Sequence, residues 1–352
     1  MSDGTALTRI QIIEDESVVD PAQDRAFVGV SSPQATGWYG PIRAAASTLI
    51  SKELRHGVLG RDCRDHQGTH DRLLAIAERL EPSDDISWAV GSLDCAIWDL
   101  HGQIEAKSVA ELLGARQVSG IRAYASWLRF DLESPSMADT VGAITGQGWS
   151  FAKWGVRAAA SPGAEARDGS KLASLVSLVR AASESVPAFD AVRTWSLPTA
   201  LAFAGGVNQR DIRWLEDPFD VASENYEQLP ASFPSIAAGE TVAGLEELRT
   251  LLASGRVRHL SLDVVGFGGI TPFIRAIGLA DAHGVKIYPH GRSLMPAIHL
   301  AAANPASIGE VEYQLQWEPI RQSMYARIVQ PVSGSISIEG LTGLGAVPRR
   351  TT

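Results

Sequence analysis

Six polar or charged residues follow short apolar runs at a nearly regular spacing in the second half of the chain: Asp190, Glu216, Glu240, Asp263, His290 and Glu312. Successive members are about 22 to 27 residues apart, which is the length of one strand, one helix and two short loops. In a (β/α)₈ barrel, the carboxyl ends of the strands meet at one face and carry the active site. The spacing therefore predicts a barrel with these residues at its mouth.

Asp190, Glu216 and Glu240 end three consecutive predicted strands, so their carboxylates are expected to converge. A ligand set of oxygens alone suits a hard cation such as Mg²⁺. Clustered carboxylates also repel one another, so a positive charge is expected beside them. The alternative is that each acid pairs with an arginine or caps the helix that follows. We predict one Mg²⁺ per subunit as the cofactor.

Asp263 and His290 end the sixth and seventh predicted barrel strands. A carboxylate can hold one imidazole nitrogen and leave the other free to take a proton, which makes the pair a candidate general base. His290 could instead be structural. Lys153, in FAKWG, ends the second predicted strand. It could face an anionic substrate or pair with a barrel carboxylate.

Other residues at the predicted mouth could contact a substrate. Glu312 could hydrogen-bond a substrate oxygen, but Glu310 shares its face by the two-residue period, so either remains possible. Arg292 could bind a carboxylate or be solvated. Three tryptophans near strand ends could line a sugar pocket or serve in packing: Trp127, Trp154 and Trp195.

The elements that position these residues begin near Ile121 and are predicted over residues 119–330. Short apolar runs alternate there with helical stretches, as in βα units with parallel strands. The runs are IRAYAS, SFAKWGV, VPAFDA, DIRWLE, SIAAG, RHLSLDVV, VKIYP and SIGEVEY. Eight candidates favour a closed barrel over an open doubly wound sheet, and the GxGxxG and GxxxxGK[ST] nucleotide signatures are absent.

The first 118 residues lack this alternation and predict a separate α+β capping domain. Two strands (residues 6–13 and 25–31) precede a Gly-rich turn, QATGWYGP, and helical patterns over residues 42–55, 69–80 and 87–101. The tail, residues 331–352, is expected to pack back on the cap. The predicted fold class is α/β: a modified TIM (β/α) barrel with an N-terminal capping domain.

Composition excludes several classes of partner. The chain has 352 residues, a formal charge of −9 and 45% apolar residues, which argues against a nucleic-acid or anionic-membrane surface. Its start shows no apolar signal region, and no segment approaches a membrane span of ~20 apolar residues. Two cysteines, Cys63 and Cys95, suggest a reducing compartment. We therefore expect a cytoplasmic location.

Seven motifs occur in an order that resembles the enolase superfamily, mandelate racemase subgroup (mandelate racemase/muconate lactonizing enzyme-like). They are SLDCAIWDLHGQIEAKSVAELLGA, FDAVRTW, WLEDP, IAAGE, LDVVGFGGIT, YPHG and GLTGLG. The resemblance implies Mg²⁺ on Asp190, Glu216 and Glu240, with the Asp263/His290 pair as general base. It also implies abstraction of the proton α to a substrate carboxylate, and a homo-oligomer.

The same resemblance gives roles to Glu312 and Lys153, both at the substrate carboxylate. The family often has K-x-K on the second barrel strand, whereas this chain has Lys153, Trp154 and Gly155. A racemase ordinarily needs a base on each substrate face, so loss of the second lysine disfavours simple racemisation. In this respect the chain resembles acid-sugar dehydratases of the rhamnonate type. Val192 replaces a frequent Asn.

These features predict a Mg²⁺-dependent acid-sugar (aldonate or aldarate) dehydratase that yields a 2-keto-3-deoxy acid. The cap loop around residues 34–41 would close on the distal end of the sugar. One alternative is a one-base isomerase, cycloisomerase or epimerase acting on a carboxylate. Another is a barrel that binds acid sugars without turning them over. The expected partner is a small carboxylate, with no nucleic acid and no membrane.

Overall fold

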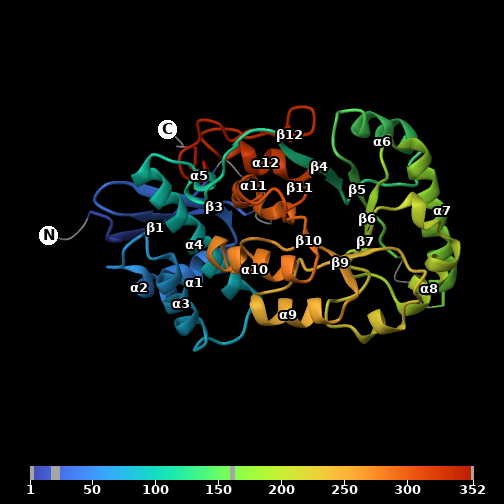
Figure 1. Ribbon diagram of the computed structural model, residues 1–352, viewed down its shortest axis with the longest axis horizontal. Helices are drawn as coiled ribbons and strands as arrows, with labels where there is room; N and C mark the ends of the chain where they lie inside the picture. The colour runs from blue at the N-terminus through green and yellow to red at the C-terminus, as the bar shows by residue number, and fades with distance from the viewer. Residues whose placement is uncertain (1–3, 17–23, 159–162, 350–352) are drawn as a thin grey trace.

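The computed structural model describes residues 4–16, 24–158 and 163–349. Figure 1 shows the N-terminal elements, in blue, beside the barrel, and the red C-terminal segment returning to their side. Over these ranges, no helix combines the length and apolar character that a membrane crossing requires.

The capping domain opens with an antiparallel sheet of β1 (Arg9–Glu14), β2 (Ala26–Ser31) and β3 (Thr36–Ile42), in that order. The central strand β2 is paired on both edges and is buried over most of its length, where it also contacts helix α4 (Asp84–Glu105). The two predicted strands are therefore present, with the third added to them.

The predicted Gly-rich turn over residues 34–41 is wrong, because most of it forms β3. Gly37 is needed there for close packing: a Cβ at this position would lie 2.2 Å from the backbone nitrogen of Leu100. Glycine here lets a strand approach a helix, which the sequence pattern alone does not distinguish from a turn. The expected cap loop around residues 34–41 is therefore also wrong for most of its length, because residues 36–41 belong to strand β3.

In the described part of the cap, the sheet is followed by six helical segments: α1 (Ala44–Leu49), η1 (Ile50–Leu54), α2 (Arg55–Val58), α3 (His66–Ala77), α4 (Asp84–Glu105) and α5 (Val109–Leu112). The predicted helix over residues 42–55 is interrupted by the π-helical turn η1. The long helix α4 begins at Asp84 and is capped by Ser83, whose side chain accepts from the Asp85 backbone N–H. Two acids in its first turn favour this start through the helix dipole.

Eight parallel strands form the barrel: β4 (Ile121–Trp127), β5 (Ala152–Gly155), β6 (Ala188–Asp190), β7 (Leu215–Glu216), β8 (Ile236–Ala238), β9 (Val257–Leu260), β10 (Lys286–Ile287) and β11 (Val311–Gln314). Neighbours in sequence pair in order from β4 to β10, and β11 pairs with β4. A parallel bridge from Ile287 to Ile308 joins the two ends of this path. The predicted barrel with an N-terminal cap is confirmed.

Helices alternate with these strands: α6 (Met137–Thr145), α7 (Glu165–Ala182), α8 (Leu197–Gly206), α9 (Leu245–Ala253), α10 (Ile270–Ala282), α11 (Leu294–Ala303) and α12 (Glu318–Ser323), with short turns η2 (Gln209–Asp211), η3 (Glu224–Gln228) and η4 (Gly291–Ser293). A separate buried cluster includes the aromatic residues Tyr124, Phe151, Trp214 and Tyr288. Tyr124 lies in strand β4, and the other three side chains come from residues that flank β5, β7 and β10. They fill the barrel as a packed core.

The C-terminal segment contacts both the barrel and the cap. Strand β12 (Ser335–Ile336) pairs antiparallel with β4. The Leu344 backbone N–H donates to Asp99 Oδ1 of α4 at 2.6 Å. His299 of α11 accepts from the Ala110 N–H at 3.1 Å through Nδ1 and contacts the Leu344 carbonyl through Nε2. One buried imidazole thus joins the barrel, the cap and the tail.

Candidate active site

Lys153 lies at the centre of three buried carboxylates. Its Nζ is 2.8 Å from Glu216 Oε1, 3.2 Å from Glu312 Oε1 and 3.4 Å from Asp190 Oδ2. Strand alternation turns Lys153 into the barrel, because its neighbours on β5 point outward. Of the alternatives for Lys153, pairing with barrel carboxylates is the one observed.

Burial and charge act in opposite directions in this group. Burial alone would lower the pKa of Lys153, but Glu216 and Glu312 outweigh it and raise that pKa well above its ordinary value. Burial raises the pKa of Glu216 to about 7, although Lys153 opposes the change. Burial likewise raises the pKa of Asp190. The Lys153 ammonium therefore does not fully offset the burial of Asp190 and Glu216, and a further positive charge would favour their ionised forms.

Glu240 lies two residues beyond β8 and is the most exposed acid of the set, with 33% of its side chain accessible. Its Oε2 is 3.2 Å from Arg193 Nη1, and its Oε1 is 3.7 Å from His290 Nε2. Arg193 also pairs with Asp217 at 3.3 Å. Sequence reasoning missed Arg193, although it follows Asp190 closely in FDAVRTW.

Asp263 holds His290 in place. Its Oδ2 lies 3.1 Å from His290 Nδ1. Its Oδ1 accepts from the Ser293 hydroxyl at 2.6 Å and from the N–H groups of Val265 at 3.0 Å and Gly266 at 2.9 Å. Burial opposes ionisation, but these hydrogen bonds and His290 lower the pKa of Asp263. The carboxylate is therefore ionised and orients the imidazole.

The other nitrogen of His290, Nε2, faces the acid cluster. It lies 3.7 Å from Glu240, 4.0 Å from Glu312 Oε2 and 3.3 Å from Gln314 Nε2. Burial opposes protonation, but Glu240 and Asp263 outweigh it and raise the pKa of His290 to about 9. Gln314, another residue that sequence reasoning missed, is held by Arg321 at 2.7 Å. It shares the inward face of Glu312 by the two-residue period, which could have revealed it.

Four of the residues predicted to contact substrate lie away from this cluster. Arg292 pairs with Asp24 of the cap. Trp154 is 1% exposed within the hydrophobic core, so a substrate contact by its ring has no support here. Two further tryptophans have the packing role that was the alternative to lining a sugar pocket. The Trp127 ring lies 5.0 Å from that of Phe130, and the Trp195 ring lies 4.8 Å from that of Phe203, between centroids.

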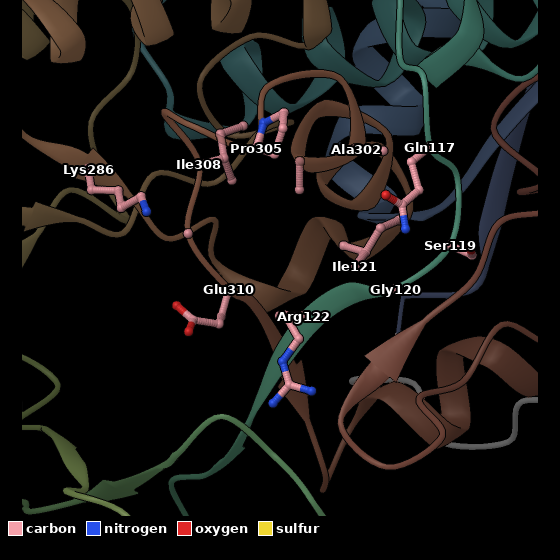
Figure 2. A pocket seen from close by; sticks show the side chains of 12 residues that line it. Gln117, Ser119, Gly120, Ile121, Arg122, Lys286, Ala302, Pro305, Ile308 and Glu310 are labelled. Carbon is pink, nitrogen blue, oxygen red and sulfur yellow. The ribbon is translucent and has the colours of Figure 1, made fainter.

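Glu312 and Glu310 are separated by the structure. Glu312 is buried beside Lys153, whereas Glu310 lines a cavity of about 300 Å³ together with Arg122 and Lys286. Figure 2 shows the three charged side chains around that cavity. They come from the amino-terminal ends of their strands, which is the face opposite the carboxylates. Glu312 is therefore the member of the pair at the candidate active site.

The position of the missing second lysine is closed by backbone. A Cβ on Gly155 would lie 2.2 Å from the carbonyl oxygen of Leu128. Real Cβ atoms essentially never approach another atom below 3.0 Å. Gly155 therefore marks a place where β5 touches the segment after β4, and a side chain cannot be added without moving the backbone.

Val192 stands where the family pattern frequently has Asn, and the structure shows what the exchange costs. Its backbone N–H donates to Asp190 Oδ1 at 2.8 Å, and its φ is 51°. This left-handed conformation suits Asn and penalises a β-branched residue. The turn that supports Asp190 is thus retained with a less suitable side chain.

The three predicted metal ligands fit a hard cation by their chemistry, because Asp190, Glu216 and Glu240 offer oxygen atoms alone. Within the described ranges, however, no group of three or more His, Cys, Asp and Glu side chains is arranged to hold a metal ion. Lys153 separates Asp190 and Glu216, and Arg193 pairs with Glu240. The three predicted ligands are therefore all present at the mouth of the barrel, but in this structure they form ion pairs with Lys153 and Arg193.

Carboxylates, an Asp–His pair and a buried lysine thus lie together at the carboxyl ends of the barrel strands, which is the face where barrel enzymes carry their active sites. Residues 136–352 match the family model described as enolase C-terminal domain-like. This match covers more than half of the chain, and the protein belongs to that family. The resemblance drawn from the motifs is confirmed.

Known relatives agree with this assignment. The chain is 26% identical over 261 residues to L-talarate/galactarate dehydratase of Salmonella typhimurium, covering 72% of this chain and 63% of that protein. It is 26% identical over 277 residues to D-galactarolactone cycloisomerase of Agrobacterium fabrum, covering 73% and 70%. The chain thus spans less than two thirds of the length of the dehydratase.

A solved structure shares the fold. It is the L-talarate dehydratase of Polaromonas sp. JS666 complexed with Mg and L-glucarate, with a TM-score of 0.74 and 24% identity, covering 97% of this chain and 91% of that one. At this identity, the likeness establishes the architecture alone.

Proposed function

We propose that the protein is an acid-sugar dehydratase that removes the proton α to a carboxylate and eliminates the 3-hydroxyl. The observation that carries this proposal is the Asp263–His290 pair, whose Nε2 faces the carboxylates at 3.7 Å from Glu240. An imidazole held on one side by an ionised acid and open on the other is suited to proton transfer.

Asp190, Glu216 and Glu240 would hold Mg²⁺, which when bound offsets the negative charge that develops on the substrate carboxylate. Lys153 contributes a fixed ammonium at the same place, buried and paired with Glu216 and Glu312. Its raised pKa keeps it charged throughout. Glu312, 3.2 Å from Lys153 Nζ, would hold that ammonium in place toward the substrate carboxylate.

In the chemical step, His290 Nε2 takes the C2 proton; it would be neutral for this once a cation held by Glu240 offsets the carboxylate charge that raises the His290 pKa. The resulting imidazolium is stabilised by Asp263 through Nδ1, at 3.1 Å. It then gives a proton to the C3 hydroxyl, which leaves as water as the C2–C3 double bond forms. The enol product tautomerises to a 2-keto-3-deoxy acid. One group can serve as both base and acid because the two transfers occur in sequence.

The opposite face of the substrate supports elimination over racemisation. Racemisation needs a second base there, and the family position for that base is Gly155, against which the Leu128 carbonyl packs. A single histidine can remove a proton and protonate a leaving group on its own side.

The test is a panel of aldonic and aldaric acids with Mg²⁺, followed by detection of 2-keto acid with semicarbazide. We expect a product that is lost with a chelator and recovered when Mg²⁺ is restored. His290→Asn should form it about 10²–10⁴-fold more slowly while it still binds Mg²⁺ by calorimetry. Formation of 2-keto acid by that variant at the wild-type rate would refute the assignment of the base.

A cycloisomerase is the second candidate, favoured by the cycloisomerase among the relatives and by the single base. Its product has the same mass as its substrate, whereas dehydration removes one water. Mass spectrometry of the panel reactions therefore separates the two functions directly.

A further inference from the structure

A cavity between the cap and the barrel lies apart from the carboxylate cluster. Its volume is about 270 Å³, close to the lower end of the range for small-molecule sites, about 300–1,000 Å³. The cap side of the cavity comes from α3 and α4, and the barrel side comes from α9, α10 and the segments after β8 and β9. Six of the side chains that line it are apolar: Leu74, Ile86, Val90, Leu245, Phe267 and Pro272. Such a lining favours a ligand with a hydrocarbon or aromatic body.

The polar groups of this cavity leave one positive charge available to a ligand. Arg275 of α10 lines the cavity with an exposed side chain and, in the described part of the chain, forms no ion pair. Asp71 accepts from Gln67 Nε2 at 2.7 Å. His70 is buried, and burial lowers its pKa, so its imidazole is neutral. The cavity therefore combines an apolar lining with an unpaired guanidinium, which is a good partner for a carboxylate.

The backbone turn after Asp263 forms part of the barrel side of the cavity. The Phe267 N–H donates to the Asp263 carbonyl at 2.8 Å, in the same turn that binds the Asp263 carboxylate through its backbone N–H groups. Gly268 also lines the cavity, and its carbonyl lies 3.2 Å from His70 Nε2 of the cap. A ligand against Phe267 and Gly268 would therefore contact the turn that orients Asp263.

Helix α4 of the cap packs closely on the same turn. A Cβ at Gly91 would lie 2.2 Å from the Val265 carbonyl oxygen and 2.9 Å from the Gly269 backbone nitrogen. The Asp94 carboxylate accepts from the Thr271 N–H, just after the turn, at 3.0 Å. Because the turn lies between the cap and the barrel, it can open only where the two separate. A ligand that fills the cavity between them would oppose that separation.

We infer that this cavity binds a small carboxylate with an apolar body, and that the bound ligand holds the turn after Asp263 in place. Arg275 pairs with the carboxylate, and the apolar body displaces water from between α4 and α10. The binding site stands on the cavity itself. Its effect on catalysis rests on the proposed function, in which Asp263 orients the base. A ligand of this class is an effector, since the cavity lies apart from His290.

Calorimetry on the Mg²⁺-loaded full chain with octanoate and its neutral amide, octanamide, tests the binding site. We expect octanoate to bind more tightly than octanamide. Arg275→Gln should weaken octanoate binding about 3- to 10-fold, the range for a partly exposed charged pair. Ser87→Phe places a ring in the cavity and should abolish binding of both probes. Arg249→Gln, at an exposed arginine of α9 outside the cavity, should bind octanoate like the wild type.

Three outcomes would overturn the site. One is octanoate binding that is unchanged in Arg275→Gln and Ser87→Phe, because the acid would then bind elsewhere, for example at the carboxylate cluster. Another is equal affinity for octanoate and octanamide, which contradicts a carboxylate ligand. The third is the absence of octanoate binding to the wild type.

Hydrogen exchange followed by mass spectrometry tests the effect on the turn. If the ligand must leave before the turn opens, octanoate at ten times its Kd should slow exchange of the amides of residues 264–269 about 10-fold. Bound octanoate with unchanged exchange over these residues would overturn that effect. Neither assay needs turnover, so both results stand whether or not any acid sugar reacts.

Discussion

Substitution of Gly155 tests why this chain lacks a second base. An ideal Cβ at residue 155 would lie 2.2 Å from the Leu128 carbonyl oxygen, 3.0 Å from its carbonyl carbon and 3.1 Å from its Cα. Three backbone atoms thus oppose the smallest side chain. Because backbone cannot rotate away as a side chain can, β5 and the segment after β4 must separate.

The cost follows from that geometry. A methyl group that must move from 2.2 Å to an ordinary contact above 3.4 Å displaces backbone by about 1 Å. Overpacking of a buried site typically costs about 1–3 kcal/mol. Replacing Gly by Ala also reduces the entropy of the unfolded chain, which returns about 0.4–1 kcal/mol. Gly155→Ala should therefore lose about 1–2 kcal/mol of free energy of unfolding.

Urea unfolding followed by tryptophan fluorescence measures this change. Gly278→Ala is the matched control, because Gly278 is exposed within α10 and a Cβ there meets nothing within 4 Å. That substitution should instead stabilise the protein by about 0.5–1 kcal/mol through helix propensity. The two alanines are therefore expected to change stability in opposite directions.

Gly155→Lys extends the test to function. The longer side chain meets the same backbone, so it should fold less stably and should not confer racemisation at the α-carbon. Two results would refute this reasoning. One is a Gly155→Ala protein as stable as the wild type. The other is a folded Gly155→Lys protein that exchanges the α-proton with loss of configuration, seen by NMR in heavy water.

Three further predictions concern other parts of the molecule. His290→Asn should lower kcat by about 10²–10⁴-fold, as expected for loss of a general base; solvent-deuterium incorporation at the wild-type rate would contradict this. Val192→Asn should raise the free energy of unfolding by about 1 kcal/mol, since Asn tolerates the φ of 51° better than Val does; an unchanged urea midpoint would count against the strain. Burial lowers the pKa of His299 to about 4, below its unfolded value of about 6.5, so the stability it contributes is present above pH 6.5 and is lost as pH falls through 4. Over that interval the loss should reach roughly 3 kcal/mol; His299→Gln should remove it, and equal pH dependence in both proteins would refute the assignment.

Much of the barrel is predictable because each unit repeats one physical pattern. Every predicted strand ends beside a polar residue, and these ends meet because parallel strands share a direction. Asp190 and Glu216 end β6 and β7 as expected. Asp263 and His290 lie three residues beyond β9 and β10, but their side chains still meet at 3.1 Å. Spacing along the chain was therefore sufficient for this pair.

The repeating sequence pattern does not predict contacts between segments that are distant in the chain. Gly37 and Gly155 both serve close approach to other backbone, but a glycine in sequence reads equally well as a turn. Arg292 turns toward Asp24, 268 residues away in sequence, and no local rule links the two. Trp154 alternates with Lys153 on β5, so the inward lysine obliges the indole to face the core.

The loss of the second lysine at Gly155 is consistent with the position of the remaining base, His290, on one side of the site. Asp263, which accepts from the Ser293 hydroxyl, holds His290 on one side of the site, while Gly155 leaves only backbone at the family position of the second base. If His290 is the base, as proposed, a proton that it takes returns from the side on which it left. Racemisation would then lack its second base, whereas the proposed elimination would use that same proton for the leaving hydroxyl. On this proposal, loss of the second lysine narrows the reaction and does not disable the site.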